Sequence, residues 1–528
     1  MSGLALAWAA SGDGGWVDAL TLVDRLAWAA SDREVAAYLR GLRSGPVAES
    51  VDPGAPLGTA LYAAEVDLIE ASSPAGEREF GLSVREAVVW RNPAEVAVRT
   101  VALRVFGAGQ DLHPNGALVR GVWVDNRPAR WSLDATVLSV ELPRPVGPGE
   151  LARLLVHVDE RVPGFSPGEP VHEGSLPLEG LGAYGHADGS VNLGWFLPVV
   201  TAVDRRGGFD VRPLYPNTEH VMSEPATFHV VFDVPSRFVV ASTGIDRVTR
   251  TDGGQSTVVA VAGGARDFAA MLVPNAAVTE AEVEGVRLRV VHPASDPRAG
   301  ADLLARATGA LGSYVRWFGP PAAREIDVVE APLRGLMAVD FPGMVAIDLR
   351  HQGAPYHPTA AQEWNLAHEL AHQWWGVDVG SDPVASPWLD EALASYCAAL
   401  YWSEKYGEDA VQARYELEVR DRLATLSRHG VEDLPADRPG YTYDLDQLAA
   451  IVQGRGSLFF DQVRGAVGDE PFFAALRGYH ATYRGRFAVA SDLVRALAEA
   501  SDDPAVQEQV RAQYERWIRE AHSYEDLL

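Results

Sequence analysis

The segment His368-Glu369-Leu370-Ala371-His372 combines residue types that can hold a metal ion and use it. On a helix, residues four apart stand one turn apart on the same face, so His368 and His372 can bind one ion together. The glutamate between them would then face a water bound to that ion. The pattern predicts a zinc site for hydrolysis, although three fixed positions in five arise by chance in roughly one chain per hundred of this length.

A hydrolytic zinc site also needs a third protein ligand and an open fourth position for water. The segment Trp388–Tyr396 predicts a second helix, and Glu391 lies in its first turn. Eighteen residues separate His372 from Glu391. The chain thus offers Glu391 as a possible third ligand.

These motifs resemble the aminopeptidase N-like zinc metallopeptidases of the gluzincin clan, which include the leukotriene-hydrolase branch. The family signature joins the same pentapeptide, an eighteen-residue gap and a ligand glutamate within Trp-Leu-Asn-Glu-Gly-x-Ala. This chain has Asp390 in place of the Asn and Ala392 in place of the Gly, and His372–Gly376 matches the family's His-Gln-Trp-Trp-Gly. The resemblance extends over nearly all of the chain after the first 58 residues.

The resemblance implies one Zn²⁺ bound by His368, His372 and Glu391. It also implies that Glu369 is the general base, which takes a proton from the zinc-activated water and passes it to the leaving amine. A family member would carry an N-terminal β saddle followed by a thermolysin-like catalytic lobe.

One departure from the family concerns the substrate's free amine. In the family, a Gly-x-Met-Glu-Asn or Gly-Met-Glu-Tyr-Pro-Gly strand supplies a glutamate that holds the α-amine. The corresponding segment Leu336–Met344 has Asp340 before Phe341-Pro342-Gly343. An aspartate keeps the charge that an ammonium group needs but reaches about an ångström less far. Asp340 is the expected amine anchor, and the alternative is a residue that ends a strand at a turn.

The second departure concerns the oxyanion of the tetrahedral intermediate. The family stabilises this oxyanion with the tyrosine of a Tyr-x-Lys-Gly helix, and the counterpart here is Gln453-Gly454-Arg455-Gly456. A glutamine amide can donate a hydrogen bond to an oxyanion, and loss of one such donor costs on the order of a hundred- to a thousandfold in rate. Gln453 is the expected oxyanion position. Tyr441 and Tyr443 could substitute, but we expect both to be solvated loop residues.

Hydrophobic periodicity and turn residues divide the chain into three expected parts. Residues 1–58 show helical periodicity and then the Pro- and Gly-rich stretch 51–56, which predicts a helical extension and a linker. From 59 to 285, β-branched and aromatic runs such as 96–105 and 228–234 alternate with turns. This pattern predicts antiparallel sheets arranged as a saddle or sandwich.

Residues 286–528 change to a small β layer and then to helices. We expect strands at 286–291, 326–329 and 344–349, a helix at 299–317 and a mostly helical chain after Ala360. By resemblance this part is the thermolysin-like catalytic domain. The expected fold class is multidomain α+β: a helical extension, an antiparallel β saddle or sandwich domain and a mostly helical catalytic domain.

The composition excludes several other chemistries. The 528 residues carry 72 Asp and Glu against 45 Lys and Arg, and the net charge of −27 argues against nucleic-acid binding. Lys405 is the only lysine and lies outside any P-loop or Schiff-base context. The only cysteine, Cys397, excludes an internal disulfide and is expected in the core. No apolar run reaches the roughly 18 residues of a membrane span.

Three functions are compatible with these residues. The leading hypothesis is a zinc metallopeptidase of the aminopeptidase type, acting on the N-terminal bond of a short peptide or on a related small amide. Asp340 and Gln453 also motivate a specialised hydrolase of a small-molecule pathway intermediate, and the missing tyrosine motivates a zinc-binding but catalytically silent interaction module. Without a convincing signal peptide, a cytoplasmic location is expected, and the oligomeric state stays open.

Overall fold

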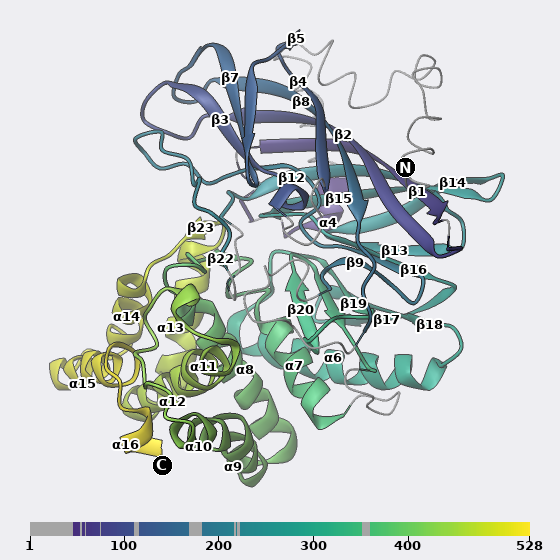
Figure 1. Ribbon diagram of the computed structural model, residues 1–528. Coiled ribbons are helices and arrows are strands. Elements are labelled where there is room, and N and C mark those ends of the chain that lie inside the picture. The colour runs from purple at the N-terminus through teal and green to yellow at the C-terminus, as the bar shows by residue number, and fades with distance from the viewer. Residues whose placement is uncertain are drawn as a thin grey trace.

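The structure is a computed structural model in which a β-rich part lies above a smaller sheet and a helical lobe (Figure 1). It describes residues 46–527 apart from 53–54, 57, 59, 74, 110–115, 168–181, 216–217, 219–221 and 351–358. The predicted helical extension, residues 1–58, lies mostly outside the described residues. Of its helices the structure describes α4 (Pro46–Ser50).

The β-rich part, which we call the β saddle, consists of one large sheet and two small ones. The large sheet has the order β14-β15-β12-β1-β2-β8-β4-β5. Its strands are β1 (Ala60–Ser72), β2 (Arg78–Arg91), β4 (Ala117–Val124), β5 (Arg127–Pro128), β8 (Leu151–Val162), β12 (Ala226–Pro235), β14 (Ile245–Asp252) and β15 (Gln255–Ala265). The first small sheet has the order β11 (Val199–Val200), β3 (Val98–Arg104), β7 (Val137–Val146) and β6 (Trp131–Asp134). The second has the order β13 (Phe238–Ser242), β16 (Ala270–Pro274), β10 (Ser190–Leu193) and β9 (Tyr184–Ala187).

The strand pairing differs in one place from the antiparallel saddle that the sequence predicts. In the described part of the saddle, β1 pairs with β12 in parallel, with Tyr62 opposite Phe228, and the other named pairs are antiparallel. More than 150 residues separate these two strands along the chain, which leaves room for the crossover that a parallel pair requires. The rings of Tyr62 and Phe228 stack with their centroids 4.7 Å apart, in a core that also contains Phe232 and Phe268.

A five-stranded sheet below the saddle contains the strand of Asp340. Its order is β17 (Ala276–Val283), β18 (Val286–Pro293), β19 (Glu325–Glu330), β21 (Met344–Ile347) and β20 (Ala338–Phe341). β18, β19 and β21 are parallel, and β17 and β20 are antiparallel edges. Helix α6 (Pro297–Phe318) connects β18 to β19, so the predicted strands and helix of this segment are confirmed. Strand β17 belongs to this sheet although it precedes residue 285, where the sequence predicts the boundary between the β saddle and the catalytic domain. That boundary stays a prediction.

The chain after this sheet is mainly helical, as predicted. Its elements are α7 (Ala360–Ala371), α8 (Trp388–Tyr406), α9 (Glu408–Tyr415), η4 (Glu416–Arg420), α10 (Asp421–Arg428), η5 (Gly440–Thr442), α11 (Leu445–Gln447), η6 (Leu448–Arg455), α12 (Gly456–Val467), α13 (Asp469–Tyr483), α14 (Ala490–Ala498), α15 (Pro504–Tyr514), η7 (Glu515–Arg519), α16 (Ser523–Leu527) and the strand pair β22 (Val379–Gly380) and β23 (Arg486–Phe487). Cys397 is fully buried, as expected. Among the described helices, none has the length and apolarity that crossing a bilayer requires.

Two arginines of the saddle attach it to the helical lobe. Arg266 is buried and donates to the carbonyls of Val377 and Arg486, at 2.9 and 2.8 Å. Arg212 Nη1 donates to both carboxylate oxygens of Asp382, at 3.1 and 2.9 Å. A fixed contact between these two parts lets the saddle form one wall of the cavity described below.

Candidate active site

Helix α7 carries the first two candidate ligands and is fixed at both ends. At its start, Thr359 and Gln362 form a reciprocal capping box, with hydrogen bonds of 3.3 and 2.7 Å. Near its end, the buried hydroxyl of Tyr314 on α6 donates to the carbonyl of Ala367 at 2.8 Å. The helix ends at Ala371, and His372 keeps helical dihedral angles as the C-cap. The two histidines therefore stand one turn apart, as their spacing predicts.

His368, His372 and Glu391, which we call the metal cluster, point their ligand atoms at one another. The Nε2 atoms of His368 and His372 are 3.1 Å apart, and Glu391 Oε2 lies 3.2 Å from the first and 3.9 Å from the second. Two donors about 2.0 Å from one ion at a tetrahedral angle lie about 3.3 Å apart. The three separations therefore fit the donor set of a tetrahedral zinc site.

The far side of each imidazole is hydrogen-bonded, which orients the ring. His372 Nδ1 donates to the carbonyl of Trp375 at 2.9 Å, so its Nε2 is the nitrogen that faces Glu391. Ser395 lies one turn after Glu391 on α8, and its hydroxyl is 3.2 Å from His368 Nδ1. Neither contact could be read from the ligand motif, and both are typical outer contacts of a metal-binding histidine.

Charges around the metal cluster favour a cation. Burial opposes the charged form of His372, but the carboxylates of Asp340, Glu391 and Glu369 outweigh it and raise the pKa of His372 to about 10. Burial also opposes ionisation of Glu391, but the hydrogen bond with His368 and the charge of His372 lower the pKa of Glu391 to about 2. Because a histidine binds a metal through a neutral nitrogen, a metal ion and a proton compete for His372.

Glu369 and Asp340 face the same cavity as the metal cluster. Their carboxylates and His372 offer ligand atoms within 4.8 Å of one another. Burial raises the pKa of Glu369 well above its usual range, and the charge of Asp340 raises it further. The cavity has a volume of about 280 Å³, and Trp195 and Thr218 of the saddle also line it. The structure thus brings the expected base and the expected amine anchor to the expected ligands.

Gln373 fixes the position of Asp340 and was not identified from the sequence. Its buried side-chain amide donates to the carbonyl of Phe341 at 2.9 Å and accepts from the N–H of Gly343 at 2.8 Å. These bonds attach the β20–β21 turn to the residue that follows His372. The family-like His-Gln-Trp-Trp-Gly motif was the available signal, since the glutamine stands beside a ligand.

Gln453 also lines the cavity, but its amide contacts a candidate ligand. Its Nε2 donates to Glu391 Oε2 at 2.8 Å, from the π-helical segment η6. Tyr441 is about half exposed, in line with the expectation. The expectation was wrong for Tyr443, which is buried because its ring packs in the core of the helical lobe and its hydroxyl donates to the carbonyl of Pro435.

Comparisons with known proteins agree with this site. The Peptidase family M1 domain matches residues 353–517. Human aminopeptidase O is 24% identical over 177 residues, which are 29% of this chain and 22% of the human protein. Aminopeptidase N of Lactococcus lactis subsp. lactis is 29% identical over 146 residues, 26% of this chain and 16% of that protein. The matches thus span about a fifth of the length of these relatives.

The similarity to a solved structure covers more of the chain than the similarity to these relatives. The crystal structure of an M1 zinc metallopeptidase from Deinococcus radiodurans has a TM-score of 0.60 and 22% identity, covering 88% of this chain and 95% of that chain. At this identity the likeness concerns the fold, a β saddle joined to a helical lobe. Residues 353–517, which contain the metal cluster and Glu369, thus match the Peptidase family M1 domain, and over this segment the chain is similar to aminopeptidase N-like zinc metallopeptidases.

Proposed function

We propose that this protein is a zinc-dependent aminopeptidase that hydrolyses the N-terminal bond of short peptides or related small amides. The observation that carries the proposal is the convergence of the metal cluster and Glu369 on one cavity. A silent interaction module would have no use for a buried carboxylate beside the ligands, so Glu369 favours the hydrolase.

The residues have separate parts in the proposed reaction. A zinc ion held by His368, His372 and Glu391 would lower the pKa of a bound water to about 7 and polarise the scissile carbonyl. Glu369 takes a proton from the attacking water and delivers it to the leaving nitrogen. Asp340 holds the substrate's ammonium group. Gln373 supports this part by fixing the end of the strand that carries Asp340, beside Glu369.

Gln453 has two possible parts, and its contact with Glu391 bears on both. One N–H of its amide orients the ligand carboxylate. The second N–H is the donor that we assign to the oxyanion, as expected from its sequence position.

Short peptides are the substrate class that the neighbours support. A mutant of the Deinococcus radiodurans M1 zinc metallopeptidase was crystallised with a Tyr-Ser-Ala substrate, at 22% identity to this chain. A cavity of about 280 Å³ suits a ligand of a few residues. The lack of nucleic-acid binding and the cytoplasmic location stay predictions from the sequence.

The test compares the zinc-loaded protein with its Glu369→Gln variant on aminoacyl fluorogenic amides and their N-blocked counterparts. We expect the wild type to cleave amides with a free amine and the blocked substrates to react much more slowly. The variant should be slower than the wild type by about 10²- to 10⁴-fold. Equal background in both proteins on every substrate would contradict the hydrolase. A preference for blocked substrates would contradict the amine anchor at Asp340.

A further inference from the structure

One wall of the cavity lies on the segments that follow α8 and contains Arg422. Glu418 on η4 makes two ion pairs, with Arg414 Nη2 at 2.8 Å and Arg422 Nη2 at 3.0 Å. Glu418 and Arg422 line the cavity. Since one carboxylate faces two guanidinium groups, the three side chains together carry an excess positive charge.

Packing determines which arginine can offer that charge to a ligand. The guanidinium of Arg414 is buried over the rings of Trp364 and Trp402, 5.4 and 5.7 Å from their centroids. Arg422, by contrast, keeps 42% of its side chain exposed. A guanidinium has five N–H donors, and the contact with Glu418 engages the Nη2 group. Arg422 is therefore the member of the set that a ligand in the cavity can reach.

Helix α7 gives a length scale for the cavity. Trp364, which packs on Arg414, precedes His368 by one turn, about 6 Å along the helix axis. The cavity lining extends along α7 from His372 to Ala361, about 16 Å. An extended dipeptide or tripeptide is roughly 7 to 11 Å long. A short peptide bound at the metal cluster can thus extend along much of the cavity, which Arg422 also lines.

We propose that Arg422 binds a carboxylate of the substrate, so that the cavity selects short peptides with a positive and a negative group. The end near the metal cluster presents Asp340 and Glu369, which suit an ammonium group. Arg422 presents the opposite charge, and Met337 is among the apolar residues of the lining. A guanidinium pairs with a carboxylate through two parallel hydrogen bonds, which makes the contact selective. This inference rests on the proposed function, since it places the substrate at the metal cluster.

Two carboxylates could fill this position, the terminal carboxylate of a short peptide or an acidic side chain. Two pairs of peptides separate them: Leu-Ala against Leu-Ala-amide, and Glu-Ala-amide against Gln-Ala-amide. Affinities are measured by calorimetry in the zinc-loaded Glu369→Gln background, where the peptides are not hydrolysed. In one of the two pairs, we expect the peptide with the carboxylate to bind at least about tenfold more tightly than its neutral partner. The pair that shows this ratio identifies the carboxylate, terminal or side-chain, that Arg422 binds.

The additional substitution Arg422→Gln should reduce that ratio to about one. Arg420→Gln is the matched control, because Arg420 makes a similar ion pair to Glu416 four residues away but does not line this cavity. Its ratio should equal that of the parent protein. Equal affinities within both pairs, a ratio unchanged by Arg422→Gln or no measurable binding would overturn the proposal. If the ratio behaves as expected but the wild type hydrolyses none of the peptides, the carboxylate site stands and the proposed aminopeptidase activity fails.

Discussion

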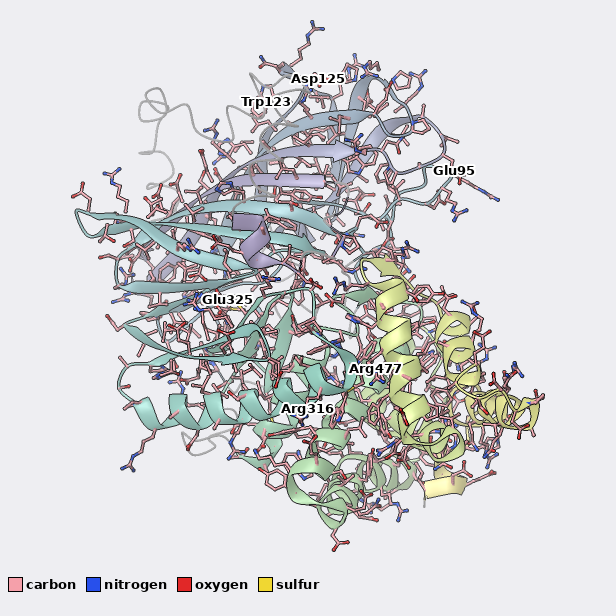
Figure 2. The ribbon with its side chains drawn as sticks, turned by 180° about the vertical axis from the view of Figure 1, so that it is seen from behind. Glu95, Trp123, Asp125, Arg316, Glu325 and Arg477 are labelled. Carbon is pink, nitrogen blue, oxygen red and sulfur yellow. The ribbon has the colours of Figure 1, made fainter. Side chains whose placement is uncertain are left out.

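Two buried clusters of ligand-type side chains in this molecule balance their charge in different ways. The ligand atoms of the metal cluster lie within 4.8 Å of one another, and so do the carboxylate oxygens of Asp246, Glu325 and Asp327. Asp246 comes from β14 of the saddle, and the other two come from β19 of the five-stranded sheet. Figure 2 shows Glu325 between the saddle and α6. We call these three residues with Arg289 the acidic clamp.

The acidic clamp contains its own cation. The Nη1 atom of Arg289 lies 2.8 Å from Asp246 and from Glu325, and 3.4 Å from Asp327. The guanidinium is buried where an ion would otherwise have to sit. In the metal cluster, two ring nitrogens face each other at 3.1 Å, which is an arrangement that a shared cation stabilises. The difference supports our proposal that the metal cluster holds the zinc ion, whereas the acidic clamp already has a cation in Arg289.

The largest expected effect is loss of the metal from one cluster only. His368→Ala removes a ligand from a three-ligand site, so the zinc content should fall from one equivalent to nearly none by elemental analysis. Asp327→Asn removes a carboxylate from the acidic clamp and should leave one equivalent bound. Retention of zinc in His368→Ala would show that the wrong cluster has been assigned.

Removal of the base should slow turnover strongly without removing the metal. General acid–base catalysis contributes about 10²- to 10⁴-fold, so Glu369→Gln should lower kcat by that factor with one zinc retained. Steady-state kinetics and metal analysis on the same sample give both numbers. A decrease below about tenfold would mean that another group accepts the proton.

Arg289→Met should destabilise the fold because it leaves buried carboxylates without their cation. Breaking a buried ion pair by removing one partner costs about 3–5 kcal/mol, which urea unfolding can measure. The folded fraction should still bind zinc, since the metal cluster does not contact Arg289. Unchanged stability would show that the acidic clamp does not depend on its arginine.

The loss in Arg289→Met should depend on pH. Burial raises the pKa of Asp327 well above its usual range; Arg289 opposes this rise, and Asp246 and Glu325 add to it. A carboxyl whose pKa is higher in the folded protein binds more protons there, so its stabilising effect is lost as pH rises through the folded pKa. Without Arg289, the pKa of Asp327 in the folded protein should rise further. The variant should therefore lose less stability at pH 5 than at pH 8, and a loss independent of pH would contradict this explanation.

The smallest expected effect concerns Gln453, which contacts the metal cluster from outside. Outer contacts of metal ligands are worth about 10- to 100-fold in metal affinity or activity, so Gln453→Ala should lie in that range. A weaker zinc affinity would identify the amide as a support of Glu391. A lower kcat with unchanged zinc affinity would identify the oxyanion donor instead, and no change in either would remove Gln453 from the site.

The sequence could predict the metal cluster because its geometry is local or repeats a known spacing. Four residues on a helix bring His368 and His372 together, and the family resemblance supplied Glu391. Gln373 and Ser395 were missed because a side chain that orients a ligand has no spacing rule of its own. Tyr443 was misjudged for a related reason, since a tyrosine among turn residues is exposed unless the lobe packs around it.

Long-range contacts explain the remaining differences between sequence and structure. Alternating residues predicted the saddle strands, but nothing local to β1 indicates that its neighbour is β12 rather than another strand. The acidic clamp joins β14, β18 and β19, and each of its residues looks like an ordinary charged position in a strand. Only the assembled sheets show that these charges are buried together.

Anomalous diffraction at the zinc absorption edge, on crystals of the full chain grown with zinc, tests the assignment most directly. The account predicts one strong peak, about 2.0–2.2 Å from His368 Nε2, His372 Nε2 and a Glu391 oxygen, and no peak between the carboxylates of the acidic clamp. A peak in the clamp, or no peak among His368, His372 and Glu391, would contradict it.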